Sequence, residues 1–213
     1  MRRRKVKGAK EKLLSYESLV YEAELLTENF VDDLGWTDED IWVEIGMGRG
    51  QFIIEYARRH PEKKFIGIEM KEEVLLRALQ KMEETPLNNI RFILGNADLM
   101  PNFIKPETLG RVFVNFCDPW PKKRWAKRRL THRGYLAKYN QLLIEEGEFH
   151  FKTDAEPLFE FSLNEIIQST HFLLSEVQLD LHQSELDIPT TEYEDKFRLK
   201  GMKIYRFVAR KRI

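Results

Sequence analysis

The 213-residue sequence predicts an α/β fold in which a mostly parallel sheet of seven strands carries helices on both faces. Three observations support this prediction. Apolar segments of strand length alternate with segments of helical periodicity. The first apolar segment runs into a glycine-rich turn. Hydrophobic residues make up 42% of the chain, which is enough for the core of a single domain over residues 1–213.

The first half of the chain contains four apolar runs that read as strands, at residues 40–46, 64–69, 89–95 and 111–118. A helix is expected at 51–60, where Pro61 stops it. A second helix is expected at 71–84, because apolar residues recur there at helical spacing, namely Val74, Leu75, Ala78, Leu79 and Met82.

The second half is expected to contain a helix at about 132–146, a strand at 148–153 and a helix at about 155–169, followed by two more strands around a loop. Strands that alternate with helices form right-handed crossovers and a mostly parallel sheet. Such sheets bind ligands at the carboxyl ends of their strands, near the point where the strand order reverses. Polar residues stand at five of these ends: Glu44 to Gly50, Glu69, Asn96 with Asp98, Asp118, and Asp154.

The glycine-rich turn has the spacing G-x-G-x-G, formed by Gly46, Gly48 and Gly50. A dinucleotide fingerprint needs a glycine at position 51, which is Gln51, so a nicotinamide oxidoreductase is disfavoured. No G-K-[ST] follows, so the turn is not a P-loop. Glu44 precedes the turn, and its carboxylate would repel a pyrophosphate and suit a cationic ligand.

Glu69 ends the second strand. Its separation along the sequence from the glycine turn is one at which an acid can bind both hydroxyls of a ribose. Together, Glu44 and Glu69 indicate a nucleoside that carries a positive charge and no phosphate. S-adenosylmethionine fits this description. Asn96 can hydrogen-bond the adenine amino group through its oxygen, and Asp98 is the alternative for that contact.

Charge is balanced in total, with 35 basic and 35 acidic residues, but the basic residues are clustered. They gather in residues 2–12, 122–138 and 198–212, and the stretch from Pro119 to Ile144 contains no acid. Clustered positive charge on a neutral chain indicates a local site for a polyanion, although solvated surface segments give the same pattern. The first of these clusters belongs to a basic tail at about 1–15 that can be flexible.

Two long motifs resemble those of one known family. The stretch D-P-W-P-K-K-R-W-A-K-R-R at 118–129 closely resembles the signature of bacterial tRNA (guanine-N7)-methyltransferases, and T-E-Y-E at 191–194, followed by Lys196 and Phe197, resembles a second motif of that family. The resemblance extends from about Leu25 to Arg210. It implies a Rossmann-like class I methyltransferase fold, S-adenosylmethionine as methyl donor, and N7 of a guanine in the tRNA variable loop as acceptor.

The resemblance also implies roles for individual residues. It places Glu44, Glu69, Asn96 and Asp118 at the cofactor, beside the glycines of the turn. It places six residues at the substrate: Lys122, Asp154, Thr191, Glu192, Tyr193 and Glu194. The basic stretch itself suits RNA, because Arg and Lys bind phosphates while aromatic rings stack on unpaired bases. Its RNA-binding candidates are Arg124, Trp125, Lys127, Arg128 and Arg129.

Asp118 is the expected catalytic residue. Guanine N7 carries a free lone pair and no proton, so the reaction needs no general base. A carboxylate there would orient the guanine and stabilise the positive charge that moves from sulfonium to purine. Asp118 can therefore act on the cofactor or on the guanine, and the sequence leaves both roles open.

Rival interpretations remain. D-P-W-P is superficially like the D-P-P-Y loop of adenine amino-methyltransferases, but Pro121 stands where that loop has an aromatic ring. A non-catalytic RNA-binding module would not need Glu44, Glu69 and Asp118. Cys117 is interpreted as a buried strand residue rather than a nucleophile. We expect no metal, no membrane span, a cytoplasmic location, and a monomer or homodimer.

Overall fold

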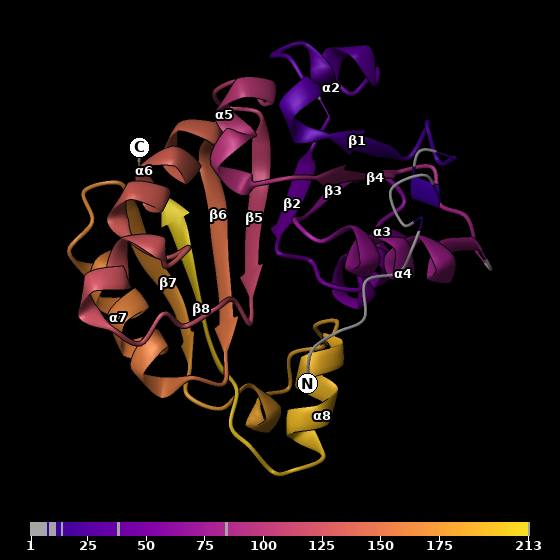
Figure 1. The fold of residues 1–213 in the computed structure, drawn as a ribbon. Helices are drawn as coiled ribbons and strands as arrows, with labels where there is room; N and C mark the ends of the chain where they lie inside the picture. Colours follow the sequence, from indigo (N-terminus) through magenta and orange to yellow (C-terminus); the bar gives the residue numbers. More distant parts are fainter. Residues whose placement is uncertain (1–7, 9–11, 14, 38, 84, 213) are drawn as a thin grey trace.

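The computed structural model describes residues 8, 12–13, 15–37, 39–83 and 85–212, so most of the expected basic tail lies outside the described residues. Eight strands form one sheet in the order β1-β4-β3-β2-β5-β6-β8-β7 (Figure 1). The strands are β1 (Val20–Glu22), β2 (Ile41–Ile45), β3 (Lys64–Glu69), β4 (Ile90–Leu94), β5 (Leu109–Asn115), β6 (Leu143–Thr153), β7 (Phe172–Gln178) and β8 (Tyr205–Lys211).

The first six strands of this order are parallel to one another, and β8 runs antiparallel to both β6 and β7. The mostly parallel sheet is therefore confirmed. The prediction of seven strands missed β1, which has only three residues at the edge beside β4 and is too short to show a periodicity.

Helices cover both faces of the sheet, as expected (Figure 1). The α-helices are α2 (Phe30–Asp33), α3 (Gln51–Arg59), α4 (Glu72–Glu83), α5 (Met100–Phe103), α6 (Arg133–Leu142), α7 (Glu156–Ile167) and α8 (Glu192–Arg198). Four short 3₁₀ helices connect them: η1 (Ala23–Leu25), η2 (Ala97–Leu99), η3 (Lys123–Arg128) and η4 (Leu181–Gln183). None of the helices in the described ranges is long and apolar enough to cross a bilayer.

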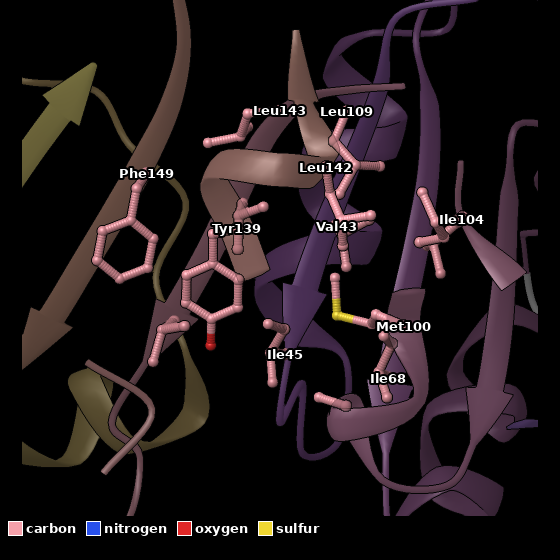
Figure 2. Close-up of a cluster of buried hydrophobic side chains, with 14 of the residues drawn as sticks. Val43, Ile45, Ile68, Met100, Ile104, Leu109, Tyr139, Leu142, Leu143 and Phe149 are labelled. Atoms are coloured by element: carbon pink, nitrogen blue, oxygen red, sulfur yellow. The ribbon is translucent and has the colours of Figure 1, made fainter. Parts of the chain in front are cut away.

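Each face of the sheet has its own hydrophobic core, because successive side chains of a strand point to opposite faces. Val43 and Ile45 of β2 pack with Tyr139 and Leu142 of α6 on one face (Figure 2). Trp42 packs with residues of α3 and α4 on the other. Trp36 and Trp42 are both buried.

The helix expected to run to residue 146 ends at Leu142, and β6 begins at Leu143. β6 bulges near its start, where Leu143 pairs with Leu109 of β5 and Glu148 pairs with Arg111. Within the bulge Glu146 has a positive φ of 58°, and Gly147 lies against the carbonyl of Ile144. A Cβ on Gly147 would sit 2.9 Å from that carbonyl oxygen. The helix ends four residues earlier than predicted because Leu143 is extended and pairs with Leu109 of β5.

The loop expected between the last two strands contains α8. Thr191 caps this helix, since its Oγ1 accepts a hydrogen bond from the Glu194 amide at 3.0 Å. Glu192, Glu194 and Asp195 occupy the first turn, and Lys196 and Arg198 the last, which suits the helix dipole. The capping pattern T-x-x-E was visible in the sequence and was missed.

The strand order reverses between β2 and β5. From β2 the chain proceeds outward through β3 and β4, and then returns to add β5 and β6 on the other side. The residues that follow β2, β3, β4, β5 and β6 therefore share one edge of the sheet. In doubly wound folds this edge is the ligand site.

Candidate active site

The glycine turn leaves β2 at this edge. Gly46 and Gly48 have φ of 71° and 61°, and no atom lies within 4 Å of where their Cβ atoms would be. Gly50 is different, because a Cβ there would come within 2.9 Å of Ile54 and 3.0 Å of Ala78. The last glycine thus lets α3 and α4 pack closely, while the first two leave open space above the turn.

Glu69 ties the glycine turn to the end of β3. Its Oε2 accepts a hydrogen bond from the Gly48 amide at 3.1 Å, and its Oε1 accepts from the amides of Met70 and Lys71 at 2.9 and 3.0 Å. Burial raises the pKa of Glu69. Each carboxylate oxygen has two lone pairs, so Oε2 retains one acceptor position for a ligand hydroxyl.

Glu44 lies beneath the turn and is only 1% exposed. Asn115 Nδ2 donates a hydrogen bond to its Oε1 at 2.8 Å, whereas Oε2 is buried and has no hydrogen-bond partner among the described residues. Burial raises the pKa of Glu44 to about 8. An unpartnered buried oxygen that is costly to ionise suits a cation bound nearby.

Glu44 belongs to a row of buried polar residues on the α3 face of the sheet. Asn115 of β5 stands opposite Lys152 of β6, which stands opposite Arg206 of β8. All four side chains are at most 6% exposed. Sequence reasoning missed the last three, although polar residues inside the otherwise apolar runs of β5, β6 and β8 were an available signal.

Lys152 connects this row to α8. Its Nζ donates to Glu194 Oε2 at 2.6 Å and to the Pro189 carbonyl at 3.1 Å, and it lies over the Phe52 ring at 4.6 Å. Burial lowers the pKa of Lys152, and the Glu194 carboxylate opposes that effect. The contact fixes α8 against the carboxyl edge of the sheet.

The expected substrate segment at 191–194 forms the first turn of α8, but its side chains point in different directions. Thr191 is occupied as the cap, and Glu192 forms an ion pair with Lys81 of α4. Tyr193 is 53% exposed, whereas Glu194 is only 2% exposed. The structure therefore presents Tyr193 to solvent and turns Glu194 toward Lys152.

Asn96 and Asp98 follow β4 and are distinguished by their partners. Asp98 is held by α6, because Lys138 Nζ lies 2.5 Å from its Oδ1 and Tyr135 donates to its Oδ2 at 3.1 Å. Asn96 accepts a hydrogen bond from the Asp98 amide at 3.0 Å and is exposed. Asp98 is therefore engaged by two side chains of α6, so Asn96 is the better candidate for an adenine contact.

Asp118 follows β5 in the sharp turn 116–121. Its side chain is exposed and forms no hydrogen bond or ion pair within the described part of the chain. Phe116 and Trp120 have positive φ of 51° and 41°, so the turn is held in a conformation that side chains rarely adopt. Arg129 supports it by donating to the carbonyls of Pro119 and Trp120 at 3.1 and 3.0 Å.

The basic stretch after this turn forms η3. Lys122 and Arg124 lie over the Trp125 ring, and Arg128 lies over Trp120, at 4.9 to 5.2 Å from the ring centroids. The exposed basic side chains of the stretch form no ion pair with any residue that the structure describes. Arg129 differs from them, because the turn and the Phe161 ring occupy its guanidinium.

Asp154 and Cys117 complete the edge. Asp154 is half-buried and follows β6, the parallel neighbour of β5, so it leaves the sheet beside the turn that holds Asp118. Cys117 lies two residues beyond the end of β5 rather than on a strand, and burial raises its pKa to about 12. A thiol that stays protonated at neutral pH is a poor nucleophile.

The described residues contain no group of acids, histidines and cysteine that could hold a metal ion.

Comparison with known proteins decides the family. A protein-family model described as "Putative methyltransferase" matches residues 38–207 of this chain. A tRNA (guanine-N(7)-)-methyltransferase of Clostridioides difficile strain 630 is 49% identical over 214 residues, with both chains covered in full. The chain belongs to the tRNA (guanine-N7)-methyltransferase family. A second relative of that name, from Geobacillus kaustophilus strain HTA426, is 44% identical and covers 98% of this chain and 96% of its own.

Solved structures agree on the fold. The 16S rRNA methyltransferase KamB superposes with a TM-score of 0.66 at 11% identity, covering 88% of this chain and 95% of its own. TrmN from Thermus thermophilus superposes with a TM-score of 0.58 at 18% identity, covering 86% of this chain and 47% of its own. The Rossmann-like class I methyltransferase fold is thus confirmed. The family match at 38–207 includes the glycine turn, the turn at 116–121 and α8.

Proposed function

We propose that this protein transfers the methyl group of S-adenosylmethionine to N7 of a guanine in the variable loop of tRNA, in the cytoplasm. One observation carries the proposal. The exposed Asp118 carboxylate stands at the strand-order reversal, between the glycine turn and a basic stretch that holds two indole rings. The relatives that share the whole chain bear the name of this activity.

The residues of the glycine turn fit the methyl donor. S-adenosylmethionine, when bound, supplies an electrophilic methyl group on a sulfonium. Glu44 has a buried, unpartnered oxygen for a cationic group, and Glu69 has one free acceptor position for a ribose hydroxyl. Asn96 would contact the adenine. The open space above Gly46 and Gly48 leaves room for the ligand against the backbone.

Asp118 would orient the guanine and stabilise positive charge as N7 is alkylated. N7 has a free lone pair, so no residue has to remove a proton. A carboxylate that has no other partner can accept hydrogen bonds from the guanine or face the developing charge. Asp154, at the end of the neighbouring strand, would share the guanine contacts, and Lys122 would bind the adjoining phosphate.

Other residues would hold the RNA. Arg124, Lys127 and Arg128 are exposed and form no ion pair with a described acid, as phosphate-binding residues need to be. Trp125 and Tyr193 offer aromatic faces on which an unpaired base can stack. Within the segment 191–194, Thr191 and Glu192 shape the turn that presents Tyr193, and Glu194 anchors it.

Nucleoside analysis tests this proposal. The protein is incubated with methyl-labelled S-adenosylmethionine and an unmodified tRNA transcript, and the RNA is digested to nucleosides. We expect the label in 7-methylguanosine. Label in another nucleoside would move the acceptor elsewhere, and tight tRNA binding without any label would favour a non-catalytic RNA-binding module.

A further inference from the structure

A second positively charged surface lies on the opposite side of α8 from the stretch 122–129. It is a groove of about 870 Å³ between α3, α4, the segment 187–190 and α8. Two acidic residues, Glu55 and Asp187, line the groove. It is also lined by five basic residues, Arg58, Arg59, Arg77, Lys81 and Arg198. Nothing in the proposed methyl-transfer site uses this groove.

The positive charge of the groove is only partly compensated. Arg59 pairs with Glu55 at 2.9 Å and with Asp187 at 3.0 Å, and Lys81 pairs with Glu192. Arg77 and Arg198 are exposed and form no ion pair with any described residue. Unpaired guanidinium groups that line one groove repel each other and attract an anion.

The wall of the groove is the segment that also borders the active site. Gln51 of α3 donates to Asp195 at 2.6 Å and approaches Thr190 at 3.4 Å, so α3 and the start of α8 form one surface. The other basic stretch packs against α7, through Arg129 over Phe161. Figure 1 shows α8 at the carboxyl edge, with α3 and α4 on one side and α7 on the other. The two basic surfaces thus flank the same edge.

We propose that this groove binds backbone phosphates of the tRNA, so that the RNA is held from both faces of the sheet while its guanine lies at the edge between them. The inference rests on the proposed function for the identity of the RNA. An open, polar groove lined by arginines suits a phosphodiester chain, because guanidinium groups bind phosphate oxygens in a fork geometry. Arg77 and Arg198 are the principal contacts.

The test compares two variants of the full chain that carry the same change in charge. The groove variant is Arg77→Glu with Arg198→Glu. The control is Lys105→Glu with Arg212→Glu, two exposed bases at the opposite edge of the sheet. Binding of an unmodified tRNA transcript is measured at several salt concentrations, S-adenosylmethionine binding is measured in parallel, and thermal unfolding confirms that both variants fold.

We expect the groove variant to bind tRNA at least about tenfold more weakly than the wild type, and its log–log salt slope to fall by about 1.5, the value for two lost phosphate contacts. The control should stay within about twofold, and S-adenosylmethionine binding should not change. Equal tRNA affinity and slope in the two variants, or loss of S-adenosylmethionine binding in the groove variant, would overturn the inference. Because the readout is binding, a wild-type protein that binds tRNA through the groove without making 7-methylguanosine would refute only the proposed function.

Discussion

Lys152 and Glu194 form a buried ion pair, with 2.6 Å between Nζ and Oε2, that joins the centre of the sheet to α8. Both side chains are at most 3% exposed. The residues lie far apart in the sequence, so only the folded chain brings them together. Glu194 was expected to lie at the substrate, and in the structure its carboxylate accepts a hydrogen bond from Lys152. We interpret the pair as the anchor that fixes the turn 191–194 at the active-site edge.

The first prediction concerns the stability that depends on this pair. Lys152→Met removes the ammonium group beside the buried Glu194 carboxylate and leaves His182 Nε2, 3.7 Å from Oε1, as its remaining described ion-pair neighbour. We expect the free energy of unfolding to fall by about 3 to 5 kcal/mol. The double variant Lys152→Met, Glu194→Met removes both charges of the pair and should be more stable than Lys152→Met alone. Urea denaturation of the two single variants and the double variant measures the coupling. Additive losses would mean that the two residues act independently.

A second prediction concerns the pH dependence of cofactor binding. Burial raises the pKa of Glu44 to about 8, so the ligand-free carboxyl is largely protonated at neutral pH. A cationic ligand favours the ionised form, and an α-amino group stays protonated up to its pKa of about 7.7. Affinity for S-adenosylmethionine should therefore rise at least about tenfold between pH 5.5 and 7.5.

The Glu44→Gln variant supplies the control, because its side chain does not titrate. Its affinity should be lower and almost independent of pH over the same interval, as measured by calorimetry. In the ligand-free wild type, the same raised pKa makes the free energy of unfolding fall as pH rises from about 4.5 toward 8, since only the folded state keeps the proton. Parallel affinity profiles for the two proteins would rule out Glu44 as the titrating group.

A third prediction separates two kinds of arginine in the basic stretch. Arg129 donates two hydrogen bonds to the turn that carries Asp118, so Arg129→Ala should lower kcat at saturating tRNA by at least about tenfold. Charge reversal of Arg124, Lys127 and Arg128 should instead weaken tRNA binding and lower its salt slope by about 2 to 3. Steady-state kinetics and salt-dependent binding distinguish the two effects. If Arg129→Ala changed only the affinity for tRNA, its positioning role would be wrong.

A fourth prediction concerns Asp118. Its exposed carboxylate has no structural partner among the described residues, so Asp118→Ala should unfold at nearly the wild-type temperature. Turnover should fall by at least about 100-fold, which is the usual cost of removing one electrostatic group at a reacting centre. Affinity for tRNA should change little. Retained turnover with a large loss of tRNA affinity would assign Asp118 to binding alone.

Much of the active-site edge could be predicted from the sequence, because parallel topology brings the carboxyl ends of strands together. Glu44, Glu69, Asn96, Asp118 and Asp154 stand at five such ends, and the structure places all of them at one edge. Periodicity also located α3, α4 and α7 to within a few residues, whereas α6 ends early at Leu142 because Leu143 enters β6.

Contacts made through the tertiary fold could not be predicted in this way. The inward direction of Glu194 depends on Lys152, which reaches it only because α8 folds back onto the sheet. Likewise, the sequence does not distinguish Arg129 from the neighbouring basic residues that can bind phosphate. Only the folded turn shows that its guanidinium donates to the carbonyls of Pro119 and Trp120. The groove beside α3 and α4 gathers Arg77 and Arg198 from positions whose local sequence gives no indication that they meet.

The central claim is that the methyl group goes to guanine N7, and a single-atom change in the RNA tests it most directly. A tRNA is prepared with 7-deazaguanosine at the variable-loop guanine, which replaces N7 by a carbon and leaves the base-pairing edge intact. We predict that the substituted tRNA binds with nearly unchanged affinity and accepts no label, whereas the unmodified tRNA accepts about one methyl group per molecule. Labelling of both RNAs at the same rate would contradict N7 of that guanine as the acceptor.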